Sequence, residues 1–207
     1  MATAAPQLLP RPRRLRLTGG TCRLPRRVSI RFSRPVPANQ RRFWAQRLSE
    51  ANASVQVLAQ TRDLNATPAI HFQLDAGWPG VGQHASPEAH MLTVTPEGIE
   101  LRANSLAGLC AGVATLSQLL RQYGRNIPCL CIQDWPDFAR RGVLLDVSRG
   151  RVPTLATLKD LATRLAGFKF NELQLYFEHT FAHRGCRRVW HDWGALTARE
   201  IRLLDAH

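Results

Sequence analysis

Residues 134–149 read Asp-Trp-Pro-Asp-Phe-Ala-Arg-Arg-Gly-Val-Leu-Leu-Asp-Val-Ser-Arg, and this stretch decides how the chain is organised. The nearly continuous apolar run from Arg141 to Val147 is typical of a strand that is covered on both faces in a parallel sheet. The segment before it, Asp134–Phe138, contains a proline and separates two different patterns of elements. The sequence therefore predicts a boundary here, between domains 1–134 and 135–207.

Beyond this strand the chain alternates between helix and strand patterns. Pro153 and Thr154 open a helix with leucines at helical spacing, and Asn171–Phe177 is a second buried-type strand. Thr197–Glu200 has the pattern of a capping box that begins another helix. The order predicts one βαβ crossover with parallel strands and half of a second. Because such a pair leaves both sheet edges unpaired, we expect the fold to be incomplete at His207.

The residues before the boundary combine strands with two helices. The hairpin is the clearest element, since Met91–Val94 and Ile99–Leu101 flank a turn with proline and glycine. Asn104 is expected to cap the helix that follows it. The other predicted elements are two strands within 13–31 broken by Gly19-Gly20 and Pro25, a helix at 43–52, strands at 55–57, 70–74 and 127–132, and a loop at 78–87. This order predicts an α+β domain.

The composition is that of a globular protein with a large excess of arginine. Of the 207 residues 44% are hydrophobic, and the formal net charge is +13. No acidic residue precedes Glu50, whereas twelve arginines do. This arm could neutralise phosphates or anionic lipid, or its arginines could cover ordinary solvated faces. We favour the solvated faces over a nucleic-acid partner, because few aromatic residues lie among these arginines to stack on bases.

Targeting and metal-binding signals are weak. No apolar stretch is long enough for a signal peptide or a transmembrane helix, and early prolines interrupt any amphipathic transit helix, so a cytoplasmic location without membrane contact is favoured. His179, His183, Cys186 and His191 are possible zinc ligands, but their spacing fits no paired-ligand pattern and arginines lie among them. We therefore expect no metal and no cofactor.

The stretch quoted above, with its D-x-P-x-F-x-x-R-G-x-x-L-D-x-S-R pattern, resembles the start of the catalytic barrel of glycoside hydrolase family 20, the β-N-acetylhexosaminidases. The upstream segments 88–94, 98–101 and 112–120 are similar to the small α+β domain that precedes this barrel. The resemblance implies an N-terminal α+β domain followed by the first β/α units of an incomplete (β/α)₈ TIM barrel.

The resemblance also implies sugar-binding residues. Arg149 matches the arginine that holds hydroxyls of the non-reducing sugar, although it could instead cap loop carbonyls. Asp146 could orient Arg149 or only anchor the barrel interior. Glu178 and His179 follow the second strand and are pocket candidates whose roles stay open, because Leu-Gln-Leu-Tyr-Phe-Glu-His departs from the pattern of many members. Trp190 or Trp193 could stack on a sugar face.

The implied activity is substrate-assisted hydrolysis of a glycan that carries a terminal N-acetylhexosamine. In this family an Asp-Glu pair on a later barrel strand orients the acetamido group and protonates the leaving oxygen, and family 20 is an exception to the usual two-carboxylate scheme. No Asp-Glu dipeptide occurs in the 207 residues. We therefore expect a hexosaminidase fragment that is inactive alone. The alternative is a non-catalytic basic protein that binds nucleic acid or carbohydrate.

Overall fold

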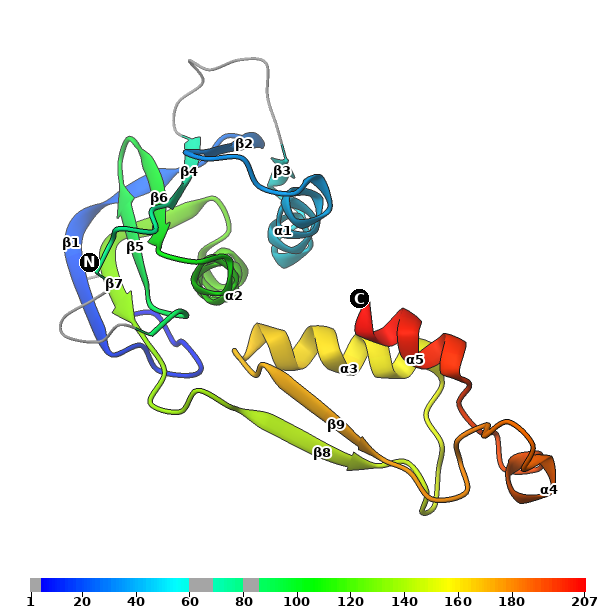
Figure 1. Cartoon of the computed structure of the whole chain (residues 1–207). Coiled ribbons are helices and arrows are strands. Elements are labelled where there is room, and N and C mark those ends of the chain that lie inside the picture. Colours follow the sequence, from blue (N-terminus) through cyan, green and yellow to red (C-terminus); the bar gives the residue numbers. More distant parts are fainter. Residues whose placement is uncertain (1–4, 60–68, 80–85) are drawn as a thin grey trace. The chain divides into compact units, whose positions relative to one another are not determined.

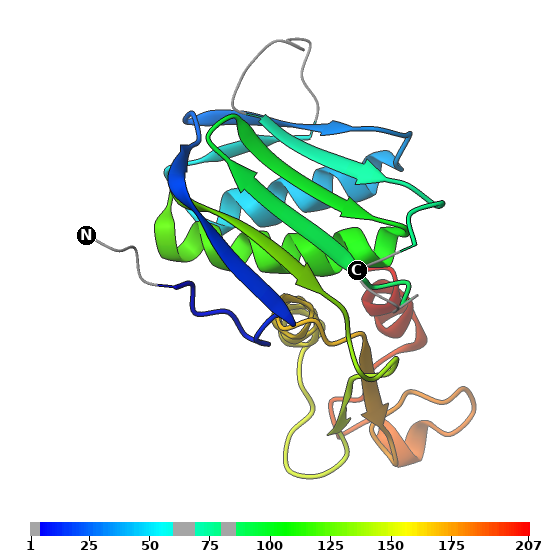
Figure 2. The same ribbon diagram turned by 90° about the vertical axis from the view of Figure 1, so that its left-hand side faces the viewer.

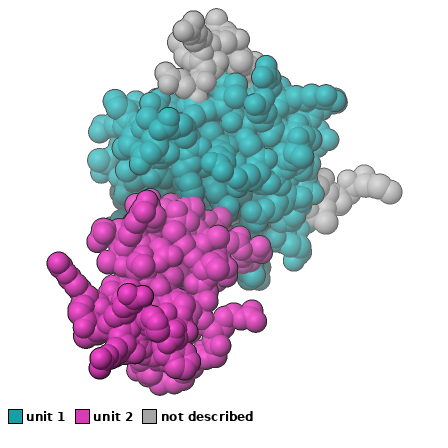
Figure 3. Space-filling view, turned by 90° about the vertical axis from the view of Figure 1, so that its right-hand side faces the viewer, with its two compact units in different colours: residues 1–139 teal, residues 140–207 magenta. Residues whose placement is uncertain are grey.

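A computed structural model describes residues 5–59, 69–79 and 86–207. The chain divides into two compact units, Met1–Ala139 and Arg140–His207, called unit 1 and unit 2 below (Figure 3). Part of the expected 78–87 loop lies outside the described residues. None of the described helices combines the length and apolar character that crossing a bilayer requires.

Unit 1 is an α+β unit, as the sequence predicted, built on one mixed sheet of seven strands in the order β1-β7-β5-β6-β4-β2-β3 (Figure 1). Strands β5 and β6 form the predicted antiparallel hairpin, and β4 pairs in parallel with β6. The elements are β1 (Arg14–Arg23), β2 (Arg27–Phe32), α1 (Ala38–Ala51), β3 (Gln56–Leu58), β4 (Ala69–Leu74), β5 (His90–Thr95), β6 (Gly98–Ala103), α2 (Leu106–Tyr123) and β7 (Asn126–Asp134).

Helices α1 and α2 cover one face of this sheet, and the core lies between the sheet and the helices (Figure 2). Alternate residues of β5 and β6 point into this core, as the period of two requires. Trp44 of α1 is fully buried and packs its ring against Phe72 of β4. Gly108 allows α2 to pack closely against the segment that leads into β5. A Cβ at Gly108 would lie only 2.7 Å from the carbonyl oxygen of Ala89 in that segment.

Three details of unit 1 differ from the sequence prediction. Helix α1 begins at Ala38, five residues before the predicted start at residue 43. The cap of α2 is Ser105, whose hydroxyl accepts a hydrogen bond from the Gly108 amide, and Asn104 lies one residue before this cap. Gly19 and Gly20 do not end a strand. They have positive φ angles where the pairing of β1 with β7 changes register, so β1 continues through them as an irregular edge strand.

Unit 2 contains β8 (Gly142–Asp146), α3 (Leu155–Gly167), β9 (Glu172–Tyr176), α4 (Arg187–Trp190) and α5 (Ala198–Asp205). The two strands pair in parallel through the crossover helix α3, as predicted. Thr197 and Glu200 form the predicted capping box of α5, and α5 packs on α3 (Figure 1). The short helix α4 was not predicted.

Strand β8 is less covered than its apolar run alone indicates. Val143 and Leu145 are half-buried, whereas Leu144, on the opposite face, is 63% exposed. An apolar run predicts that a strand can be covered on both faces, but neighbouring elements must supply the cover.

Candidate functional site

The four candidate sugar-binding residues lie at the carboxyl ends of β8 and β9. Asp146 is the last residue of β8 and Arg149 follows three residues later. Glu178 and His179 lie two and three residues after the end of β9. Because parallel strands end at the same edge of a sheet, the segments that follow them meet, and the Val147 amide donates to the Tyr176 carbonyl across the junction at 3.1 Å.

Arg149 bridges two carboxylates. Its Nη1 donates to Oδ2 of Asp146 and its Nη2 donates to Oε1 of Glu178, each at 2.5 Å. Charge-assisted hydrogen bonds of this kind are short and orient the planar guanidinium. The structure therefore brings Asp146, Arg149 and Glu178 together as one cluster, called the Arg149 cluster below.

Tyr176 is a fourth member of the cluster that the sequence analysis missed. Its hydroxyl donates to Oε1 of Glu178 at 3.0 Å, and the Arg149 guanidinium carbon lies 5.5 Å from its ring centroid. Residues two apart on an extended segment share a face, so the spacing of Tyr176 and Glu178 was the signal that could have found it.

Asp146 does more than pair with Arg149. Its Oδ1 accepts hydrogen bonds from the backbone amides of Ser148 at 2.8 Å and Arg149 at 3.2 Å. These backbone hydrogen bonds, first that of Ser148, and the hydrogen bond from the Arg149 side chain lower the pKa of Asp146. The same pair raises the pKa of Arg149. Asp146 therefore accepts hydrogen bonds both from the Arg149 side chain and from the backbone that carries it.

A buried pair of hydroxyls ties the two strand ends together beneath the cluster. Ser148 and Thr180 are both buried, and their side-chain oxygens lie 3.1 Å apart. The Ser148 hydroxyl also accepts a hydrogen bond of 2.6 Å from the Glu178 amide. The pair fixes the backbone that carries Arg149 and Glu178, and no sequence pattern had indicated it.

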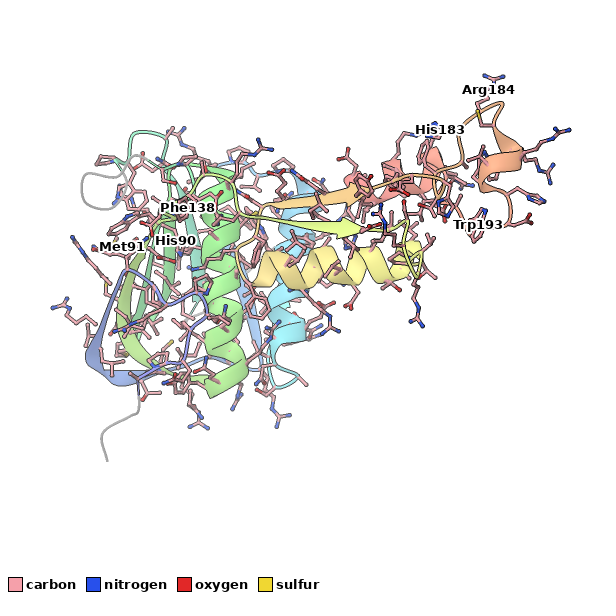
Figure 4. All side chains as sticks on the ribbon, turned by 90° about the horizontal axis from the view of Figure 1, so that it is seen from below. His90, Met91, Phe138, His183, Arg184 and Trp193 are labelled. Atoms are coloured by element: carbon pink, nitrogen blue, oxygen red, sulfur yellow. The ribbon has the colours of Figure 1, made fainter. Side chains whose placement is uncertain are left out.

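His179 does not join the Arg149 cluster. It lines a separate recess of about 370 Å³ together with Trp193, whose ring lies 5.0 Å from the imidazole in an edge-to-face arrangement. Arg151, Ser148 and Thr180 also line this recess. Trp193 lies at the end of unit 2 that carries α4, where His183 and Arg184 also lie (Figure 4). An exposed indole beside hydroxyls can stack on the apolar face of a sugar ring.

Within the described residues, no group of three or more His, Cys, Asp and Glu side chains could hold a metal ion. Of the four residues considered for zinc, His179 faces Trp193 and His191 pairs with Asp192 at 2.8 Å. The Arg149 cluster is instead suited to binding hydroxyl groups. Its guanidinium can donate hydrogen bonds to vicinal hydroxyls, and its carboxylates can accept hydrogen bonds from them.

Comparison with known proteins identifies the family. The model of glycosyl hydrolase family 20, domain 2, matches residues 5–135. The chain belongs to glycosyl hydrolase family 20. The resemblance inferred from residues 134–149 and the upstream segments is thus confirmed, and a basic binding protein outside this family is not favoured.

Curated family 20 relatives match shorter parts of the chain. A beta-hexosaminidase of Akkermansia muciniphila is 39% identical over 92 residues, which are 43% of this chain and 18% of that protein. The human beta-hexosaminidase subunit beta is 35% identical over 124 residues, or 58% of this chain and 21% of that protein. The matched region is therefore about a fifth of these relatives' length.

Solved structures of the family share the fold. The exo beta-N-acetylglucosaminidase of Vibrio harveyi, in complex with N-acetylglucosamine, aligns with 100% of this chain and 35% of its own at a TM-score of 0.77 and 19% identity. The N-acetyl-beta-hexosaminidase of Streptomyces plicatus aligns with 99% of this chain and 44% of its own at 0.73 and 22%. The chain thus spans less than half of each enzyme.

Proposed function

We propose that this chain forms the amino-terminal part of a β-N-acetylhexosaminidase and binds the terminal N-acetylhexosamine of a glycan at the Arg149 cluster. The observation that carries the proposal is the Arg149 guanidinium held between Asp146 and Glu178 at the carboxyl ends of two parallel strands. In barrel enzymes the substrate binds at this end of the strands. Arg149 would donate to sugar hydroxyls, while Glu178 would accept from them.

Residues 135–207 would be the first two β/α units of a (β/α)₈ barrel. The parallel pairing of β8 with β9 through α3 supports this assignment. In the two-stranded sheet of unit 2, the even-numbered residues of β8 and β9 lie on the same face. On this face Leu144, Gln174 and Tyr176 are exposed. In a closed barrel such a face points to the interior and is covered by the other strands.

Catalysis would need residues outside these 207. In the substrate-assisted mechanism the acetamido carbonyl attacks the anomeric carbon, an aspartate orients the amide, and the neighbouring glutamate protonates the leaving oxygen. The chain contains no Asp-Glu dipeptide. The Arg149 cluster would contribute binding and orientation of the sugar, and the proton donor would come from a later barrel strand.

Two assays test this proposal. The purified 207-residue protein should release no nitrophenol from a nitrophenyl N-acetylglucosaminide. Turnover by this protein would contradict the proposal that the proton donor lies outside these 207 residues. A chimera in which residues 1–207 replace the aligned part of the Streptomyces plicatus enzyme should hydrolyse the same substrate.

The chimera also allows the contribution of Arg149 to kcat/KM to be measured. The Arg149→Gln substitution should lower kcat/KM by about a hundredfold, since an arginine that binds substrate through charge-assisted hydrogen bonds is lost. Arg164→Gln is the matched control, because Arg164 forms an exposed ion pair with Asp160 on α3 and should leave kcat/KM within about twofold. Equal effects of the two substitutions would contradict the role of Arg149.

A further inference from the structure

The first residues of β1 and the chain that leads into it enclose a basic recess of about 1190 Å³, here called the arginine recess. Its polar lining comes mainly from arginine side chains, and none of the described residues that line it is acidic or aromatic. Those that matter here are Arg11, Arg13, Arg14, Arg16, Gln7 and Gln133.

The outer wall of this recess is held in place by helix α2. Gln122 accepts from the Gln7 amide at 2.9 Å and donates to the Gln7 carbonyl at 2.6 Å. Gln118, one helical turn earlier, makes the same pair of hydrogen bonds with Leu9 at 2.9 and 2.7 Å. The two glutamines thus satisfy alternate backbone groups as a neighbouring strand would, so the wall is an ordered part of unit 1.

Two of the four arginines are oriented by contacts within unit 1. Arg13 forms an ion pair with Asp137. Arg14 donates to Oε1 of Gln133 at 3.3 Å, and its guanidinium carbon lies 5.6 Å from the Trp135 ring centroid. Among the described residues, no carboxylate pairs with the Arg14 guanidinium.

Arg11 and Arg16 complete the positive lining. Within the described residues neither guanidinium has an ion pair or side-chain hydrogen bond. Arg14 and Arg16 are two residues apart on β1, so they point to the same side at a spacing of about 7 Å. Regularly spaced guanidinium groups suit carboxylate or sulfate groups repeated along a chain, because each guanidinium presents a fixed fork of donors to two oxygens of one group.

We propose that the arginine recess binds the sulfate or carboxylate groups of an acidic glycan. A glycan is the favoured polyanion because the chain belongs to a glycosyl hydrolase family, no described residue that lines the recess is aromatic, and the nearby Trp135 ring already contacts the Arg14 guanidinium. This site lies in unit 1 and is separate from the Arg149 cluster of unit 2. It does not depend on the proposed function.

Isothermal titration calorimetry at low salt with a heparin-derived sulfated octasaccharide tests the proposal. The 207-residue protein should bind this probe, and the Arg11→Gln/Arg16→Gln variant should bind at least about tenfold more weakly. Arg42→Gln/Arg121→Gln is the matched control, because it removes two exposed arginines of unit 1 that lie outside the recess. Its net charge equals that of the Arg11→Gln/Arg16→Gln variant. The control should change the affinity by less than about twofold.

Three results would overturn the proposal. Equal loss in the two variants, both folded by circular dichroism, would mean that the net charge alone attracts the probe. An uncharged chitooligosaccharide of the same length that binds as tightly would exclude recognition of anionic groups. A single-stranded oligonucleotide of matched charge that binds as tightly as the octasaccharide would exclude a preference for glycans.

Discussion

Units 1 and 2 bury their apolar residues to very different extents. Unit 1 packs two helices on a seven-stranded sheet, whereas among the described residues only three of the buried apolar ones belong to unit 2: Val147, Leu158 and Leu196. Conversely, seven of the eleven large hydrophobic residues that are exposed belong to unit 2. Stability is therefore concentrated in unit 1, and the Arg149 cluster lies in the unit with little core of its own.

This contrast bears on how the proposed sugar site is held. In unit 2 the strand ends are fixed by polar contacts, chiefly the Ser148–Thr180 pair and the hydrogen bonds of Asp146. A site held in this way depends on a few hydrogen bonds in place of a packed core. The proposed barrel assignment explains the contrast, because the remaining strands would cover the exposed sheet face.

The largest expected effect is on amide hydrogen exchange in the intact chain. Amides in β5, β6 and β7 should exchange at least about a thousandfold more slowly than those in β8 and β9, because local opening of a poorly packed unit costs much less free energy than unfolding of a core. Exchange followed by mass spectrometry measures both sets together. Similar protection of the two sets would contradict the inference that stability is concentrated in unit 1.

Matched leucine substitutions measure how much each unit gains from burying apolar side chains. Leu116→Ala in the core of unit 1 should lower the free energy of unfolding by about 2–5 kcal/mol, because it leaves a cavity. Leu161→Ala in α3 should cost less than about 2 kcal/mol, since Leu161 is only half-buried. Urea denaturation followed by circular dichroism gives both values, and the reverse order would contradict the account.

A third effect concerns the hydroxyl pair beneath the Arg149 cluster. Ser148→Ala removes the acceptor of the Glu178 amide and the partner of the Thr180 hydroxyl, so opening of this junction should become about 1–3 kcal/mol easier. Faster exchange of the Glu178 amide would report this change. Ser148→Thr keeps the hydroxyl and serves as the control. An unchanged rate in Ser148→Ala would show that the pair does not hold the junction.

The smallest expected effect is the pH dependence of the cluster. The folded pKa of Asp146 is lowered, so its contribution to stability is fully present above its unfolded value of about 3.9 and is lost as the pH falls through the folded pKa. Carboxyl chemical shifts followed by NMR should place the Asp146 midpoint below that of exposed aspartates, and Arg149→Gln should raise it. A midpoint at or above the ordinary value would contradict the pairing.

Elements with a local cause could be predicted from the sequence. The capping box of α5, the β5–β6 hairpin and the parallel β8–α3–β9 unit depend on residues close together in the chain. The exact cap of α2 could not be predicted, because Asn104 and Ser105 are adjacent and both are good capping residues. The exposure of Leu144 could not be predicted either, because burial depends on what packs against a strand.

The candidate site was predicted in part for similar reasons. Asp146, Arg149 and Glu178 come together because parallel strands end at one edge. His179 lies apart with Trp193, because successive residues of an extended segment point in opposite directions. The Ser148–Thr180 contact joins residues 32 apart in sequence and carries no local signal.

The most direct test of the central claim is titration of the isotope-labelled chain with N-acetylglucosamine, followed by NMR of the arginine side chains. The Arg149 side-chain signal and the Glu178 amide should shift on saturation with the sugar at millimolar concentrations, and Arg149→Gln should abolish the shift at Glu178. Shifts confined to other residues, or an unchanged Glu178 response in Arg149→Gln, would contradict it.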